Sequence, residues 1–419
     1  MKPAIHYSTV EGRSLGYWGL LGFLGFVLLL GLGATWMMEH NGHHITGMNN
    51  QVIWGMPHVF AVFMIIAASG ILNVASIGSV FGRKMYKPLG RLSALLAFAF
   101  LAGGLMVLML DLGRPDRLVI AATYLNPTSV FAWNILLYPG FFLAVLVYVW
   151  FMMDRSMYKH SQKAGLFAFV WRLLLTTGTG SIFGFVIARQ GYDAAVLAPM
   201  FIIMSFGFGL AIYILTLMAA CRWSGRELGD TVLRTLKNLL GVFIAAMFYF
   251  VFVFHLTTLY GTENHGIERF ILMDGGIYTQ LFWIGWVVIG MLLPMAIVYH
   301  PSMGKSRNWI GIASGMVIIG GLSSMYVIII GGQAYPMPIF PGFEYSSSFG
   351  DGVVADYTPS IWEIGLGLGG FALAFAMTTF AVKVLPFLPN SLEDSLVDPH
   401  YKAPVEEVVE TVEAEAEAG

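Results

Sequence analysis

Long apolar segments recur along almost the whole sequence, and each could cross a bilayer as a helix, which requires roughly 20 apolar residues. Hydrophobic residues make up 57% of the chain and charged residues only 11%, whereas a typical soluble domain contains about 25% charged residues. Such a chain cannot cover itself with polar surface, so we predict an all-α polytopic membrane protein. Ten segments qualify as transmembrane helices: 15–37, 53–80, 90–110, 129–152, 165–188, 195–220, 238–260, 277–299, 309–331 and 361–385.

The distribution of basic residues predicts how the chain is oriented. Lys and Arg concentrate on the cytoplasmic side of membrane proteins. Of the 22 basic residues, 18 fall in one set of alternate loops and span ends. The other set contains only Arg114, Arg117, Arg189 and Arg269. We therefore predict that both termini lie in the cytoplasm, and that the loops of the second set face outward.

The spans leave no room for a soluble domain. We expect a single transmembrane domain over 1–390, followed by an acidic cytoplasmic tail over 391–419 that is disordered, because it is rich in Glu and poor in aromatic residues. The longest outer loop, 332–360, has no basic residue and several prolines with aromatic neighbours. This composition favours a rigid, packed lid.

Ionisable residues within spans are rare and costly, so each one is a functional candidate. The four candidates are His58 early in span 2, Asp111 at the end of span 3, His255 late in span 7, and Glu363 at the start of span 10. All four fall near the predicted outer face. This common depth favours a functional site on that side of the membrane.

Each candidate also has a structural interpretation. Either histidine could be an interface residue that bonds a backbone carbonyl. Asp111 could pair with Arg114 or Arg117 as a clasp. Glu363 could cap its helix together with Ser360, since the two fit a capping box. The functional interpretation therefore depends on the observation that all four residues fall at a similar depth in the membrane.

A shallow pocket with histidine, carboxylate and aromatic side chains suits a quinone. The quinone ring is flat and apolar, its carbonyl oxygens accept hydrogen bonds, and its reduction consumes protons together with electrons. A histidine or carboxylate that water can reach could deliver these protons. We therefore expect menaquinone or ubiquinone as a substrate.

Resident redox cofactors are not expected. The single cysteine, Cys221, excludes an iron–sulfur cluster held by this chain alone, because such clusters need several thiolates. A haem-bearing cytochrome b stays open as an alternative, but only His58 and His255 lie well inside spans, and they could bracket at most one haem. The loop after span 1 has three histidines that could bind a metal but fit a polar loop better: His40, His43 and His44.

The segment after span 3 resembles a known family. It reads Asp111-Leu112-Gly113-Arg114-Pro115-x-Arg117, followed by Asn126-Pro127-Thr128-Ser129 and then Trp133. This pattern is similar to the hallmark of the NrfD-type membrane subunits, the polysulfide-reductase-like family. The resemblance extends over essentially all ten spans, including the stretch from Gly331 to Glu363. The ten spans and the sequence FHLTTLYGTENHG at 254–266 look most like the DsrP type of sulfur-metabolism complexes.

The resemblance implies an integral subunit that exchanges electrons with the quinone pool. Such proteins carry no redox cofactor of their own. They work beside a periplasmic ferredoxin-like subunit with [4Fe–4S] clusters, sometimes with a multihaem cytochrome c and further membrane or cytoplasmic redox subunits. We expect two packed four-helix bundles plus flanking helices, in the cytoplasmic (inner) membrane of a bacterium.

The expected quinone pocket lies in the bundle of spans 2–5, near the outer face. His58 would exchange a proton with a quinone oxygen, and Asp111 would relay protons and orient Arg114. Tyr124 and Trp133 would line the ring or hold the loop. Two second-rank candidates complete the expected quinone-binding set: His255 and Glu363.

A secondary transporter is the remaining alternative, and it would have broken helices and polar residues at the bilayer midplane. The inner halves of the spans contain few ionisable residues, and we expect these to extend to the cytoplasmic surface: Arg91, Arg172 and Lys383. Ser69, Asn73 and Ser76 stand at helical spacing on span 2 and could form a proton path. We nevertheless expect protons to exchange with the outer side and the chain alone not to pump.

Overall fold

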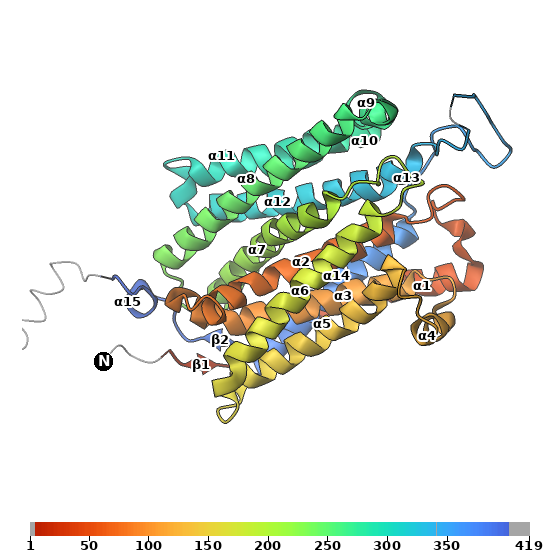
Figure 1. Ribbon diagram of the computed structural model, residues 1–419. Coiled ribbons are helices and arrows are strands. Elements are labelled where there is room, and N and C mark those ends of the chain that lie inside the picture. The colour runs from red at the N-terminus through yellow and green to blue at the C-terminus, as the bar shows by residue number, and fades with distance from the viewer. Residues whose placement is uncertain (1–4, 341, 402–419) are drawn as a thin grey trace, which may run out of the picture.

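The computed structural model describes residues 5–340 and 342–401. Ten of the helices described there are long and apolar enough to span a membrane, which confirms the predicted polytopic all-α class. The long helices run side by side along the molecule (Figure 1). Their bounds are α1 (Leu15–Asn41), α2 (Met56–Ser79), α3 (Gly90–Leu110), α5 (Val130–Met153), α6 (Ser161–Gly184), α7 (Leu197–Ser224), α8 (Asp230–Tyr260), α10–α11 (Ile277–Tyr299), α12–α13 (Arg307–Ala334) and α14 (Ile361–Val384).

The helix ends differ from the predicted spans where side chains pack beyond the apolar segment. Hydropathy predicts the seventh span at 238–260, but α8 begins at Asp230. Its first turns are amphipathic, and Val232, Leu233 and Leu236 are buried, so packing extends the helix past the point where hydropathy falls. Two short helices in the loops, α4 (Leu118–Thr123) and α9 (His265–Arg269), are not predicted from the sequence.

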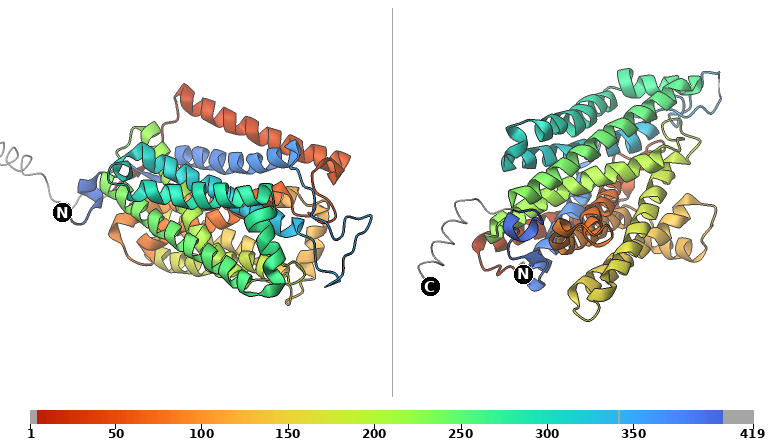
Figure 2. Two further views of the ribbon diagram at one scale, coloured as in Figure 1. Left: turned by 90° about the horizontal axis from the view of Figure 1, so that it is seen from above. Right: turned by 60° about the vertical axis from the view of Figure 1, so that its left-hand side comes forward.

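Contacts between the helices define two four-helix bundles, as predicted. The first bundle consists of α2, α3, α5 and α6, and the second of α7, α8, α10–α11 and α12. Helix α7 packs against α2 and α6 and so joins the bundles. Helix α14 packs on α3 and α2, and α1 packs on α14 (Figure 2). These last two helices are the flanking pair.

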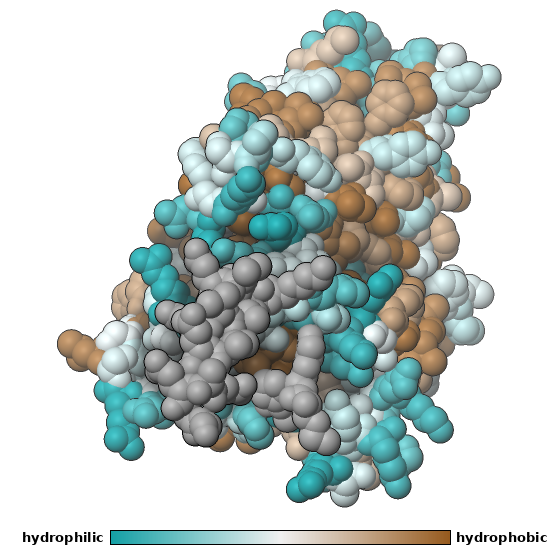
Figure 3. Space-filling view, turned by 90° about the vertical axis from the view of Figure 1, so that its left-hand side faces the viewer, coloured by the Kyte–Doolittle hydropathy of each residue, from teal (hydrophilic) through white to brown (hydrophobic). Residues whose placement is uncertain are grey.

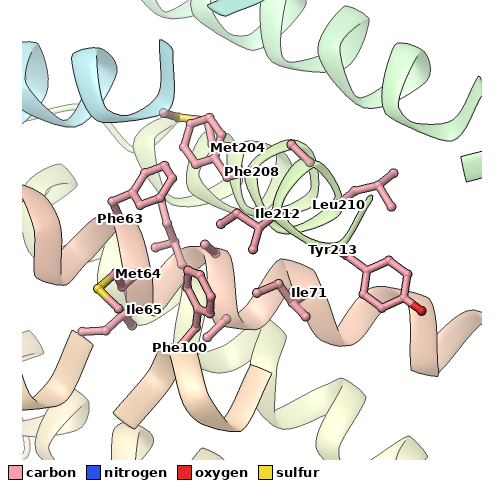
Figure 4. Close-up of a cluster of buried hydrophobic side chains, with 14 of the residues drawn as sticks. Phe63, Met64, Ile65, Ile71, Phe100, Met204, Phe208, Leu210, Ile212 and Tyr213 are labelled. Carbon is pink, nitrogen blue, oxygen red and sulfur yellow. The ribbon is translucent and has the colours of Figure 1, made fainter. Parts of the chain in front are cut away.

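The two bundles meet across a tightly packed apolar core. Phe63 on α2 stacks on Phe208 of α7, with ring centroids 5.3 Å apart, and Figure 4 shows both rings between the helices. The backbones also approach closely, because a Cβ atom built on Gly70 would collide with the carbonyl oxygen of Ser205. Small residues allow this kind of contact between membrane helices.

The first described strand and the segment that follows α14 meet at one end of the molecule, which we call the inner end. Strand β1 (Tyr7–Ser8) pairs antiparallel with β2 (Leu388–Pro389). Arg226, in the loop between α7 and α8, donates hydrogen bonds to backbone oxygens of both strands, Leu388 O and Ser8 O among them. Figure 3 shows hydrophilic residues gathered over this end. The opposite end, with the loops 42–55, 111–129, 185–196, 261–276 and 335–360, is the outer end.

The chain stays packed beyond the expected start of the tail at 391. Leu392 N donates to Glu227 O, and the Asp394 carboxylate accepts a hydrogen bond from Thr231 N in the first turn of α8. Asp394 begins the short helix α15 (Asp394–Val397). The structure therefore anchors the first part of the predicted tail, and residues 402–419 of that prediction lie outside the described residues.

The three cations inside spans do not behave alike. Arg91 bonds Pro386 O and Met152 O, and Lys383 bonds Gly12 O, all near the inner end. Arg172 instead has an exposed fraction of 0% and lies at the middle of α6. The expectation that Arg172 reaches the cytoplasmic surface is wrong, because its guanidinium bonds groups on α2 within the bundle.

Candidate functional site

A histidine and a carboxylate meet at the outer end of the first bundle. His58 lies in the first turn of α2, which Pro57 helps to start, and Asp111 is the C-cap of α3. His58 Nδ1 lies 2.8 Å from Asp111 Oδ2. The His58 side chain is 18% exposed and that of Asp111 only 1%. The pair therefore joins the two most extensively packed helices of the bundle at the point where the imidazole reaches the surface.

The polar atoms of this pair are not all satisfied by the protein. Among the described residues, His58 Nδ1 and both oxygens of Asp111 have no hydrogen bond of good geometry, although the two groups are in contact. Buried polar atoms without partners are uncommon in native structures. The Asp111 carboxylate can therefore accept hydrogen bonds from water or a ligand.

An aromatic ring packs against His58, and further rings pack against that ring. Trp54 stacks on the imidazole, with centroids 6.1 Å apart and an interplanar angle of 26°. Trp54 also contacts Phe131, Phe183 and Tyr192, at 5.8 to 6.3 Å between ring centroids. The four rings come from four different segments and form an aromatic wall beside the imidazole, which Trp54 contacts.

One buried glutamine fixes Trp54 in this position. The side-chain oxygen of Gln333 accepts hydrogen bonds from Ile53 N and Trp54 N, and its amide nitrogen donates to Trp54 O and Ile329 O. Arg189 then donates to Gln333 O at 2.7 Å, and burial lowers the pKa of Arg189. A small recess beside this frame, under the outer loop, is lined by residues such as Gln51, Arg189 and Gln333.

Glu363 is a structural member of the same end of the molecule. It is fully buried, and Ser360 and Glu363 form the capping box of α14. Its carboxylate also accepts hydrogen bonds from Gly47 N and from the Tyr357 hydroxyl, and that hydroxyl accepts one from Met56 N. Burial, reinforced by the Glu363 charge, raises the pKa of Tyr357. The capping interpretation of Glu363 is confirmed. Its connection to the His58 site runs through the Tyr357 hydroxyl to Met56 N at the start of α2.

The loop after α3 does not place its side chains as expected. Arg114 bonds Asp116 at 2.9 Å and both are exposed, so the expectation that Asp111 orients Arg114 is wrong, as is a clasp between them. Tyr124 is 82% exposed. Trp133 donates its indole N–H to Pro127 O at 2.7 Å, which agrees with the alternative that it holds the loop.

A second histidine–carboxylate pair occupies the second bundle. His255 Nδ1 on α8 lies 2.8 Å from Glu268 Oε2 on α9, and the Phe254 and Phe282 rings pack edge-on against the imidazole. Both side chains are nearly inaccessible, at 11% and 3%. His255 Nε2 is buried, without a hydrogen-bond partner in the described part of the chain. The structure therefore pairs His58 and His255 with separate carboxylates, in separate bundles.

His40, in the last turn of α1, and His43, in the loop after it, have local contacts. His43 Nε2 bonds the backbone oxygen of Asp111 at 3.2 Å, and His40 stacks on Trp36. Within the residues that the structure describes, no group of three or more His, Cys, Asp or Glu side chains could hold a metal ion.

Several residues that shape these sites are not predicted from the sequence. The search for ionisable residues inside spans does not select Trp54 and Gln333, because both are uncharged, although Gln333 is a polar residue at the end of an apolar span. The same search does not select Glu268, because it lies in a loop between spans. Arg172 also shows that ionisable groups are not confined to the outer end.

The fold and the His58–Asp111 pair define a polytopic membrane protein with two four-helix bundles and a protonatable site at the end of one bundle. The chain belongs to the NrfD family: the family model described as "Polysulphide reductase, NrfD" matches residues 44–337. This result confirms the resemblance seen in the sequence.

Several relatives match almost the whole chain. The chain is 29% identical to the "Hdr-like menaquinol oxidoreductase integral membrane subunit" of Archaeoglobus fulgidus, over 94% of this chain and 100% of the relative. It is 23% identical to a selenate reductase subunit of Mesobacillus selenatarsenatis, over 88% and 94%. It is 21% identical to the "Menaquinone reductase, integral membrane subunit" of Nitratidesulfovibrio vulgaris, over 87% and 90%. These similarities support a membrane subunit of a quinone-linked oxidoreductase.

Proposed function

We propose that this chain is the quinone-reactive membrane subunit of a multisubunit oxidoreductase in the bacterial cytoplasmic membrane. The observation that carries the proposal is the contact between His58 and Asp111, which leaves His58 Nε2 available beside the aromatic wall of Trp54. The similarity to a menaquinol oxidoreductase membrane subunit supports the same substrate class. Menaquinone or ubiquinone would bind at the outer end of the first bundle.

In this proposal His58 accepts and releases the quinol protons, and Asp111 stabilises the protonated imidazole. When a quinol is oxidised, it loses two electrons and two protons. His58 Nε2 accepts a proton from the quinol hydroxyl as a general base, and the Asp111 carboxylate stabilises the imidazolium at Nδ1. The proton then leaves to water at the outer end. Quinone reduction uses the same steps in reverse.

The electrons pass to another subunit, since Cys221 is the single cysteine of the sequence and cannot hold an iron–sulfur cluster alone. A periplasmic ferredoxin-like [4Fe–4S] subunit is the proposed partner, docked on the outer loops at 111–128 and 332–360. A multihaem cytochrome c would extend the chain of electron carriers.

The central test replaces His58 in the intact complex. We expect His58→Gln to lower the quinol turnover number by about 100-fold, because positioned general bases typically contribute factors of that size. Asp111→Asn should have a smaller effect of about 10-fold, as expected for a residue that orients and stabilises another. The measurement is steady-state quinol oxidation with an artificial acceptor in detergent.

The matched control is His44→Gln, on the exposed side of the same outer end. It should keep native activity. Full activity of a correctly assembled His58→Gln complex would exclude this histidine as the proton carrier.

A second experiment tests the docking face. Phe343 in the outer loop and Trp223 at the inner end are both exposed aromatic residues, at 78% and 71%. A photo-crosslinking amino acid at position 343 should capture the iron–sulfur subunit, and the same probe at position 223 should not. Capture of that subunit from position 223 alone would place the partner on the wrong side for this proposal.

A further inference from the structure

Arg172 is a fully buried cation at the centre of the first bundle. It lies at the middle of α6 with an exposed fraction of 0%. Its guanidinium donates to Asn73 Oδ1 at 2.6 Å and to Ser69 O at 3.3 Å, both on α2. The centres of the Phe169 and Phe206 rings lie 4.7 and 5.2 Å from its central carbon. Arg172 Nε has no partner among the described residues.

No carboxylate neutralises this charge within the described part of the chain. The ion pairs found there join other residues: His58–Asp111, Arg114–Asp116, His255–Glu268, Arg269–Asp274 and Arg307–Asp230. A charge in a low-dielectric interior is costly when it lacks a counter-ion. Its neighbours satisfy two of its donors through neutral oxygens and leave the net positive charge in place.

The charge lies across a row of polar groups on α2. The Thr176 hydroxyl donates to Ser69 Oγ at 2.7 Å, Asn73 bonds Arg172, and Ser76 follows one turn later on the same helix. Ser69 is about 16 Å along the helix axis from His58, at roughly 1.5 Å per residue. Hydroxyl and amide groups in such a row could conduct protons with the help of water. Arg172 is hydrogen-bonded to two members of this row, Ser69 and Asn73.

We propose that Arg172 is an electrostatic barrier that stops protons from crossing the first bundle between the inner end and the His58 site. A fixed positive charge in a medium of low dielectric strongly repels a hydronium ion, and pores use arginine to exclude protons and cations in this way. The inference rests on the proposed function, because the barrier makes protons from His58 leave at the outer end.

The test measures passive proton flux into sealed vesicles that contain the purified complex and a trapped pH-sensitive dye, with a potassium diffusion potential as the driving force and no quinone present. Arg172→Met keeps a long side chain and removes the charge. We expect it to raise the flux roughly tenfold, because one unscreened charge in this environment changes the energy of a passing cation by several RT. Arg172→Lys, which keeps the charge, should stay close to the native flux.

Two variants of Asn73 separate an electrostatic barrier from a purely structural clasp. Asn73→Ala removes the hydrogen-bond partner and keeps the charge, so the vesicles should stay tight. Asn73→Asp places a carboxylate against the guanidinium and neutralises it without altering Arg172, so the flux should rise. This second variant also serves if Arg172→Met does not fold. Tight vesicles with a folded Asn73→Asp or Arg172→Met complex would overturn the proposal, and so would a leak through Asn73→Ala equal to that of Asn73→Asp.

The outcome is independent of the quinone assay. The flux measurement uses neither quinol nor an electron acceptor, so a failure of His58→Gln to lower turnover would refute the proposed function and leave the flux result intact. Conversely, native proton flux in vesicles with the Arg172→Met complex, together with an inactive His58→Gln complex, would refute the electrostatic barrier and leave the proposed function intact.

Discussion

At the scale of single residues, Gln333 connects two distant parts of the chain. Its amide makes hydrogen bonds to the backbone of 53–54 and to Ile329, and it is only 1% exposed. The residue therefore links the end of α13 to the segment that presents Trp54 to His58. Gln333 therefore holds Trp54 beside His58 through backbone hydrogen bonds, although Gln333 itself is uncharged.

We expect Gln333→Leu to destabilise the protein and loosen the site. Leucine has a similar size but removes the hydrogen bonds that Gln333 makes with Ile53 N, Trp54 N and Trp54 O, and each such bond contributes about 0.5–1.5 kcal/mol. The measurement is thermal unfolding in detergent, combined with the Michaelis constant for quinol. Gln190→Leu is the control, because the bond from Gln190 to Glu263 O is at the surface. Equal melting temperatures for the two variants would contradict this role of Gln333.

The sequence revealed the candidate residues better than their partners. His58, Asp111 and His255 stood out because ionisable side chains inside spans are rare, and each does take part in a histidine–carboxylate contact. Their pairing depends on which helix ends come together, and periodicity and charge do not determine that arrangement. Gln333 carries no charge, so the same argument could not select it.

At the scale of elements, the contact between α2 and α7 joins the bundles. Gly70 lies against Ser205 O, and a Cβ atom built on Gly209 would collide with Ile71 N. The two backbones therefore touch without side chains between them. Close contact of this kind holds membrane helices together through van der Waals packing, because lipid provides no hydrophobic driving force.

Gly70→Ala should weaken this joint. The added methyl group overlaps a backbone oxygen that cannot rotate away, and overpacking typically costs about 1–3 kcal/mol. Gly25→Ala on α1 is the matched control, because its Cβ atom would have no neighbour within 4 Å. The expected result is a lower melting temperature for Gly70→Ala and a native one for Gly25→Ala. A native melting temperature for both variants would contradict the prediction, because it would mean that α2 and α7 accommodate the added methyl group without loss of stability.

Elements were predictable where hydropathy defines them. All ten spans were expected, because lipid requires long apolar helices with satisfied backbones, whereas α4 and α9 lie in loops that this argument does not address. The start of α8 was misplaced since Val232 and its neighbours are buried by protein contacts and not by lipid.

At the scale of the whole molecule, orientation is still a prediction from the basic residues. Native Cys221 is only 5% exposed, so introduced cysteines should report their own side with little background. Glu344→Cys, in the outer loop, should react with a membrane-impermeant maleimide on intact cells. Lys159→Cys, at the inner end, should react only after the membrane is permeabilised. The reverse labelling pattern would invert the proposed topology and with it the side on which protons leave.

The packing of α1 has a consequence for synthesis of the chain. Helix α1 is made before the other nine membrane-spanning helices, yet it packs on α14, the last of the ten. Likewise β1, which precedes α1, pairs with β2, near residue 389. During translation the first helix must therefore wait in the lipid until the other nine have been inserted. A chain that stops short of α14 leaves α1 undocked and β1 unpaired, so an interrupted product exposes at its N-terminus the surfaces by which a membrane protease could recognise it.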